Sequence, residues 1–308
     1  MNFPVSRSRA TVPNRFAFTP RLLALGLLLP VSSLLAAEDD PITAARALYR
    51  ERGKSVEAQA AFDAIAAADP KNHVAQLHLG LLALRRDDTE KAIAHLERAI
   101  ALSPNNGDSH KALGDACGRS AQKASVFKQL GFAKRCVASY ERAVALAPDR
   151  VDYRLSLFEY YYRAPGIVGG GRDKALAEAA TIKKLDDLGG RILFARVAID
   201  DKKIPEAFAQ FEEVLTTAPD DYNALYQIGR LSALTGQQLD RGLATLRRCL
   251  ELTPPAKPST PSHANVHWRI GTLLEKKSDP AGARASYETS VKLDPTFTSA
   301  TEALKKLK

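Results

Sequence analysis

The sequence predicts an all-α fold, namely an α-α superhelical solenoid of about seven helix-turn-helix repeats with a capping helix at its C-terminal end. Apolar residues recur at helical spacing from residue 41 onward, and no long segment alternates apolar and polar side chains as a strand would. Proline, glycine, aspartate and asparagine, which interrupt helices, separate these stretches. Segments with nearly the same ending return at intervals close to 34 residues, which is typical of stacked repeats.

The first element, residues 1–37, has the composition of a secretory signal peptide. It contains four arginines and no acidic residue, and an apolar run from Leu22 to Leu35 is followed by Ala36 and Ala37 and then by three acids. The run is shorter than the about 20 apolar residues that cross a bilayer. We therefore expect this segment to be removed on export to the periplasm of a Gram-negative-type cell. The alternative is an uncleaved segment that anchors the chain in the inner membrane.

The repeats follow the signal segment, and six of them end in a similar apolar and alanine-rich run closed by a proline. The first two of these prolines are 34 residues apart, and the next intervals of 44, 71, 35 and 41 equal one, two, one and one periods with a few residues added. Proline lacks a backbone N–H and therefore ends the second helix of each unit. The prolines are Pro70, Pro104, Pro148, Pro219, Pro254 and Pro295.

The intervals divide the chain after the signal segment into three parts. Residues 38–252 are expected to form repeats 1–6, residues 253–263 a stiff proline-rich linker, and residues 264–308 repeat 7 and the capping helix. Repeat 3 is expanded by about ten residues between Gly118 and Ala133, which we expect to lengthen its helices. Repeat 4 is degenerate: it lacks the closing proline and contains a glycine-rich loop, Ala164–Gly171, expected to be a flexible connection, with anion binding by its N–H groups as the alternative.

Small and large residues alternate within each unit in a fixed order. Small residues suit the points where two helices approach most closely, and large residues fill the space between these points. This order, with its period of 34, resembles the tetratricopeptide repeat, a helix-turn-helix unit. Repeat 2 carries it in Leu79, Gly80, Ala92, Ala99 and Pro104, and repeat 7 in Ile270, Gly271, Ala283, Tyr287 and Pro295. The resemblance implies stacked repeats, because one helix pair cannot bury its apolar face alone.

The resemblance also implies a binding groove lined by the first helix of each repeat and occupied by a protein or peptide partner. Arg196 and Arg230 have the same position in successive repeats, so we expect them to be neighbours within an aromatic and cationic surface that anchors an extended peptide with an acidic group. The alternative is ordinary solvated surface. The predicted groove residues are Lys111, Asp115, Glu159, Tyr162, Arg196, Tyr226, Arg230 and Trp268.

One subgroup of this family clamps a C-terminal carboxylate with a lysine and an asparagine. Lys111 matches the lysine, but Asp115 stands where the asparagine should be, which argues against the clamp. An enzyme or glycan-binding protein built on the same solenoid would need converging acids, for which Asp115 and Glu159 are the candidates.

Composition and motifs exclude several other classes. The formal charge is +9, but four arginines belong to residues 1–37, and the remaining 40 basic and 35 acidic residues leave +5 without the concentrated basic stripe of a nucleic-acid-binding protein. No nucleophile elbow, zincin motif or dinucleotide fingerprint occurs, so we expect neither an enzyme nor a cofactor. His263 and His267 have metal-compatible spacing, but Ala264 replaces the zincin glutamate, and no metal site is expected.

The chain has three cysteines. Cys117 and Cys136 are expected on facing helices of repeat 3, where an oxidising compartment would permit a disulfide. The alternative is that they are small buried packing residues, as we expect for Cys249.

Overall fold

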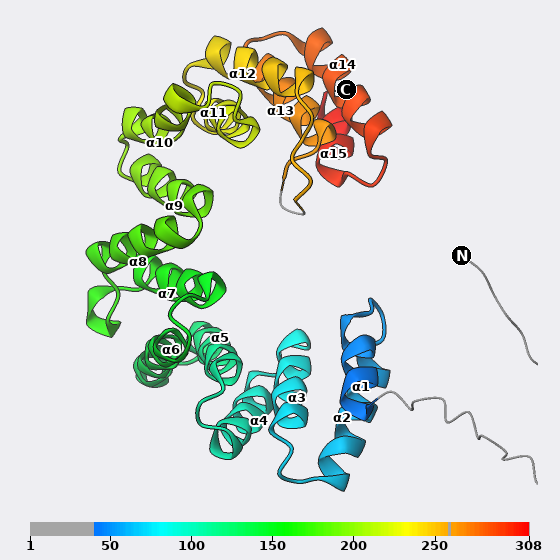
Figure 1. Cartoon of the computed structure of the whole chain (residues 1–308), viewed down its shortest axis with the longest axis vertical. Coiled ribbons are helices and arrows are strands. Elements are labelled where there is room, and N and C mark those ends of the chain that lie inside the picture. The colour runs from blue at the N-terminus through cyan, green and yellow to red at the C-terminus, as the bar shows by residue number, and fades with distance from the viewer. Residues whose placement is uncertain (1–39, 258–259, 308) are drawn as a thin grey trace, which may run out of the picture. The chain divides into compact units, whose positions relative to one another are not determined.

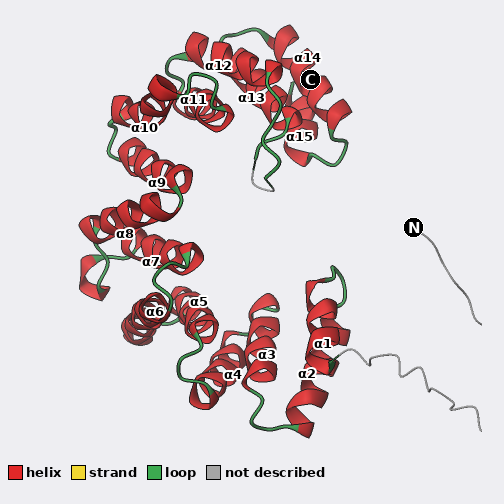
Figure 2. Cartoon of the chain, viewed as in Figure 1, coloured by secondary structure: helices red, strands yellow, loops and turns green. Residues whose placement is uncertain are grey.

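The computed structural model describes residues 40–257 and 260–307, and in this part of the chain the regular structure consists of 15 α-helices and one short 3-10 helix, without a strand (Figure 2). All of these helices belong to one unit, Pro41–Lys308. The predicted signal segment lies outside the described residues. In the described part, no helix combines the length and the apolar character needed to cross a membrane.

The helices form seven consecutive pairs followed by a single helix, and each helix packs against the helices before and after it in the chain (Figure 1). This arrangement confirms the predicted all-α solenoid. The pairs are α1 (Pro41–Arg50) with α2 (Ser55–Ala68), α3 (His73–Arg85) with α4 (Thr89–Leu102), α5 (Gly107–Lys123) with α6 (Val126–Leu146), α7 (Val151–Arg163) with α8 (Arg172–Leu185), α9 (Asp187–Asp200) with α10 (Ile204–Thr217), α11 (Tyr222–Thr235) with α12 (Leu239–Glu251), and α13 (His263–Lys276) with α14 (Pro280–Leu293), before α15 (Thr298–Lys306).

Polar side chains fix where many of these helices begin. Asn72, Asp88 and Asn106 precede α3, α4 and α5 and accept hydrogen bonds from the first free backbone amides of these helices. Such caps stabilise a helix start by about 1 kcal/mol each. Ser262 and Asn265 form a reciprocal capping box at the start of α13, directly after the proline-rich linker.

The two helices of a repeat approach closely where the sequence places small residues. A Cβ atom added at Gly80 in α3 would lie 2.6 Å from Leu96 Cγ in α4, and one added at Gly271 in α13 would lie 2.5 Å from the ring of Tyr287 in α14. Leu96 is completely buried and Tyr287 nearly so, so neither side chain can move aside without disturbing the core. The order of small and large residues therefore determines how closely the helices of a repeat pack.

Repeats 3 and 4 depart from the regular unit. In repeat 3, α5 has 17 residues and α6 has 21, whereas the helices of repeats 2 and 4–7 have 13 or 14. In repeat 4, the loop before α8 contains the 3-10 helix Gly166–Val168, and the amides of Gly169, Gly170 and Gly171 donate to carbonyl oxygens of residues 161–166. The amides of these three glycines are therefore used within repeat 4 itself, and the loop is a hydrogen-bonded turn.

Candidate peptide-binding surface

The first helix of each repeat carries the residues that the sequence assigns to partner binding, and in repeat 3 two of them bind each other. Lys111 and Asp115 lie one turn apart on α5 and form an ion pair with an N–O distance of 2.7 Å. The second carboxylate oxygen of Asp115 accepts a 2.7 Å hydrogen bond from the Tyr140 hydroxyl of α6. Both oxygens of Asp115 therefore have partners within the repeat.

A second group lies between α7 and α9, and we call Phe158, Glu159, Tyr162 and Arg196 the α7–α9 cluster. The guanidinium of Arg196 donates to both oxygens of Glu159, the longer bond measuring 3.1 Å. Its carbon lies 4.4 Å from the ring centroid of Tyr162, and the Tyr162 ring stacks on that of Phe158. The hydrogen bond from Arg196 lowers the pKa of Glu159, so this carboxylate is ionised and neutralises the arginine at neutral pH.

Tyr162 adds an unusual feature to this cluster. Its hydroxyl is buried and has no hydrogen-bond partner, although the guanidinium of Arg172 lies 5.3 Å from the ring on α8. A buried polar group without a partner costs about 1–3 kcal/mol. The ring of Tyr162 therefore stabilises the cluster by stacking against Arg196 and Phe158, whereas its hydroxyl forms no stabilising hydrogen bond.

A third group lies on α11 and α13, and we call Arg230, Trp268 and Arg269 the α11–α13 cluster. Arg230 donates to the side-chain oxygen of Gln227 at 3.2 Å. The guanidinium carbon of Arg269 lies 3.9 Å from the ring centroid of Trp268, while its Nε is buried without a hydrogen-bond partner. Burial and the nearby charge of Arg269 lower the pKa of Arg230. No acidic side chain of the described residues forms an ion pair with either arginine, so this cluster carries uncompensated positive charge.

The structure corrects the groove prediction for Tyr226. Tyr226 is only 6% exposed and packs with Leu243, Val266 and Ile270 in a core cluster, because α13 lies directly against α11. It therefore cannot offer its ring to a partner. Arg196 is engaged with α7, and the charged neighbour that lowers the pKa of Arg230 is Arg269.

The sequence analysis missed Arg269. Its position directly after Trp268 on a first helix was the available indication, but the deciding fact is its closeness to Arg230 of the preceding repeat, which only the packed structure provides.

Two stretches of the chain match sequence models described as tetratricopeptide repeat, residues 43–107 and residues 264–297. These two stretches therefore carry tetratricopeptide repeats. No curated protein sequence is significantly similar to it over its length.

Solved tetratricopeptide-repeat structures share this fold. A tetratricopeptide repeat protein from Parabacteroides merdae superimposes with a TM-score of 0.54 at 14% identity, covering 87% of this chain and 97% of that one. Yeast Tom70 superimposes with a TM-score of 0.59 at 15% identity, covering 82% of this chain and 51% of that one, so the chain spans about half of that protein. At such low identity the similarity concerns the fold alone.

The three cysteines are all free and buried, so the structure does not contain the disulfide suggested for Cys117 and Cys136. The two residues are on the paired helices α5 and α6, as the repeat register predicts. Burial raises the pKa of both thiols, that of Cys136 to about 12. Because the thiolate is the reactive form, these cysteines are poorly suited to oxidation and act as small packing residues, as does Cys249.

The two histidines with metal-compatible spacing, His263 and His267, lie on α13. No group of three potential metal ligands occurs among the described residues, and the Nε2 atom of His263 lies 3.0 Å from the carbonyl oxygen of Leu252.

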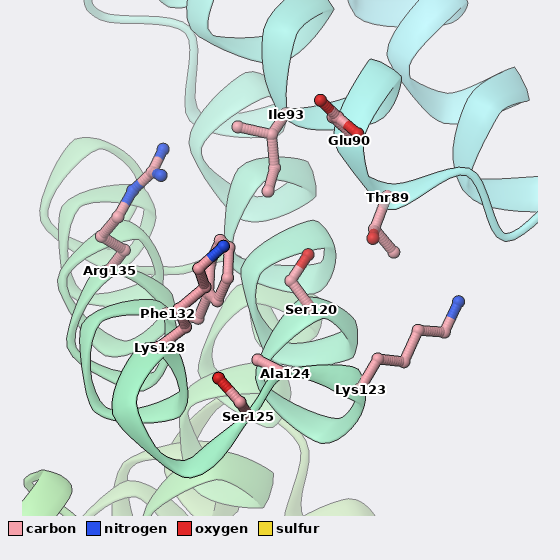
Figure 3. Close-up of a pocket in the computed structure, with 10 residues that line it drawn as sticks. All are labelled: Thr89, Glu90, Ile93, Ser120, Lys123, Ala124, Ser125, Lys128, Phe132 and Arg135. Atoms are coloured by element: carbon pink, nitrogen blue, oxygen red, sulfur yellow. The ribbon is translucent and has the colours of Figure 1, made fainter.

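A pocket of about 570 Å³ lies between α4, the end of α5 and the start of α6 (Figure 3). Its lining includes Ile93, Phe132 and Arg135, and none of the predicted partner-binding residues contributes to it. The extra residues of repeat 3 were the only sequence feature that could have indicated this pocket.

Proposed function

We propose that the protein is a non-enzymatic interaction scaffold of the cell envelope that holds an extended peptide with an acidic group against the first helices of repeats 4–7. Stacked tetratricopeptide repeats present a row of parallel first helices, and such surfaces bind proteins. The signal-like composition of residues 1–37 favours export. A chain anchored in the inner membrane by the same segment remains the alternative.

The observation that carries the proposal is the uncompensated charge of the α11–α13 cluster. Arg230 is half-buried with only an amide oxygen as its hydrogen-bond partner, and Arg269 keeps a buried Nε atom unpaired beside Trp268. Desolvated arginines are costly unless an anion pairs with them, and arginine and tryptophan are typical of binding hot spots. A carboxylate of the partner would supply both the missing charge and the missing hydrogen-bond acceptor.

The enzyme alternative finds little support in the two candidate acids. Asp115 binds Lys111 and Tyr140, and Glu159 binds Arg163 and Arg196. A general acid needs a raised pKa, whereas the pKa of Glu159 is lowered. The two carboxylates are therefore held in ion pairs, in keeping with a scaffold.

The proposal can be tested by selecting displayed peptides on purified protein. Peptides rich in aspartate and glutamate should be enriched, and they should bind the Arg230→Ala/Arg269→Ala variant much more weakly than the parent chain. Arg142→Ala is a matched control, because Arg142 is exposed on α6 and binds only Asn105. Selection of peptides without acidic residues, or equal binding by both variants, would remove the proposal.

The envelope location needs a separate measurement. Intact mass of the protein isolated from its cell should show the loss of about 37 residues if the segment is cleaved. A full-length mass in the membrane fraction would favour the anchored alternative instead.

A further inference from the structure

The inserted part of repeat 3 has an unusual charge composition. From Ala116 to Tyr140 the chain contains no aspartate or glutamate, although 35 acids are spread over its 308 residues. The same stretch contains five basic residues, Arg119, Lys123, Lys128, Lys134 and Arg135. This stretch forms the second part of α5, the turn after it and the first part of α6. The positive charge of this stretch is therefore concentrated around the turn that joins α5 and α6.

Large apolar side chains are exposed in the same place. Phe127 is 97% exposed, the highest value for a large apolar residue in the described part of the chain, and Val126 and Leu130 are 80% and 40% exposed. All three lie in the first two turns of α6. Phe127 and Leu130 are three residues apart, so they share one side of the helix. We call residues Lys123–Lys134 the α5–α6 tip.

The apolar side of the tip faces away from the pocket of Figure 3. Ser125, Lys128 and Phe132, spaced three and four residues apart, line that pocket from one side of α6. Phe127 and Leu130 are offset from these residues by about half a turn around the helix. Val126, Phe127 and Leu130 consequently do not line this pocket.

The basic residues of this stretch differ in whether they form ion pairs. Lys123 forms an ion pair with Asp87, and Arg135 with Glu97. Lys128 and Lys134 form no ion pair with any described residue. Two ammonium groups of α6 are therefore without an ion pair. Lys134, seven residues after Phe127, shares its side of the helix, and Lys128 lies about a quarter of a turn away at the edge of the pocket.

We propose that the α5–α6 tip binds the surface of an anionic lipid bilayer. Phe127, Val126 and Leu130 would enter the boundary between headgroups and acyl chains, and Lys128 and Lys134 would reach the lipid phosphates. Exposed aromatic and aliphatic residues among lysines are the combination that interfacial membrane segments use. Lysine stems can lie along apolar surface while their charges remain at the headgroups. Exposed apolar residues outside the pocket suit a bilayer, whereas a peptide or protein ligand would be expected to use the neighbouring pocket.

This contact would hold the protein at a membrane surface independently of residues 1–37. It also uses a different part of the molecule from the peptide surface of repeats 4–7. The two proposals can therefore fail separately.

Co-sedimentation with lipid vesicles tests the contact. The protein is residues 41–308, because all described helices and core clusters lie within this self-contained unit and the apolar segment before it would bind lipid by itself. We expect binding to vesicles of phosphatidylcholine mixed with phosphatidylglycerol, and about tenfold weaker binding to phosphatidylcholine alone. Phe127→Ser should weaken binding about tenfold, and Lys128→Glu/Lys134→Glu by at least as much.

Ile167→Ser is the matched control, because Ile167 is an apolar residue of the Gly-rich loop with 82% exposure. Its binding to the mixed vesicles should equal that of the parent chain, and circular dichroism should be the same for all variants. Absence of binding to mixed vesicles, or equal losses in Phe127→Ser and Ile167→Ser, overturns the proposal. A change in molecular mass by light scattering on Phe127→Ser, without vesicle binding, would assign the tip to a second copy of the chain instead. Arg230→Ala/Arg269→Ala should leave vesicle binding unchanged.

Discussion

Arg196 and Arg230 occupy equivalent positions in successive repeats, yet they have opposite electrostatic surroundings. Arg196 lies between the carboxylate of Glu159 and the ring of Tyr162. Arg230 has an amide oxygen and the second arginine Arg269 as neighbours. In each case the difference arises from one residue of an adjacent repeat. This residue is Glu159 of the preceding repeat for Arg196, and Arg269 of the following repeat for Arg230. Position within a repeat therefore predicts which face a side chain occupies, but the adjacent repeat decides whether its charge is available to a partner.

The largest expected effect concerns acidic peptide binding. Removing both arginines of the α11–α13 cluster should weaken binding of a selected acidic peptide about 100-fold, since charge-assisted contacts to desolvated arginines are worth roughly 2–5 kcal/mol. Arg196→Ala should change the same affinity less than about threefold, because this arginine is already neutralised by Glu159. Isothermal calorimetry on the two variants measures the contrast. Equal losses would mean that the two clusters act alike and that the comparison is wrong.

The second prediction concerns stability and its dependence on pH. Glu159→Gln should lower the free energy of unfolding by about 1–2 kcal/mol at pH 7, because a half-buried, doubly hydrogen-bonded carboxylate is lost. The pKa of Glu159 is lower in the folded state than the ordinary value of 4.5, so its contribution is present above pH 4.5 and is lost as the pH falls through the folded-state pKa. The difference between the parent chain and Glu159→Gln should therefore shrink below about pH 4.5.

Urea unfolding at pH 7 and at pH 3 provides the measurement. Glu288→Gln is the control, because Glu288 is exposed on α14 and forms no ion pair with a described residue. A pH-independent difference for Glu159→Gln would contradict the assigned ion pair.

The fold was predictable because its determinants are local and repeated. The closing prolines and the pairs such as Gly80 with Leu96 lie within one period, so a single sequence displays them several times. The ion pair of Lys111 with Asp115 is also local, since residues four apart on a helix are neighbours. Contacts within a repeat can thus be predicted from spacing alone.

Contacts between repeats could not be predicted in the same way. The burial of Tyr226 depends on how α13 packs against α11 across the proline-rich linker. The pairing of Arg196 with Glu159 depends on how repeat 5 is placed against repeat 4. These distances follow from the angle between neighbouring repeats, which the spacing of residues does not fix. The exposed Phe127 was missed for a related reason: the length of the insertion was visible, but not which of its residues would lack a packing partner.

The smallest expected effect is that of removing the hydroxyl of Tyr162, for which the hydroxyl of Tyr140 in repeat 3 provides the comparison. Tyr162→Phe should leave the free energy of unfolding unchanged or raise it by up to about 1 kcal/mol, because the removed hydroxyl has no hydrogen-bond partner and the stacked ring is kept. Tyr140→Phe should lower it by about 1–2 kcal/mol, because that hydroxyl donates to the carboxylate of Asp115. Thermal unfolding of both variants under one set of conditions distinguishes them. If Tyr162→Phe were the more harmful change, the hydroxyl of Tyr162 would have to bind a group that the packed helices do not supply, and the α7–α9 cluster would join the α11–α13 cluster as a recognition site.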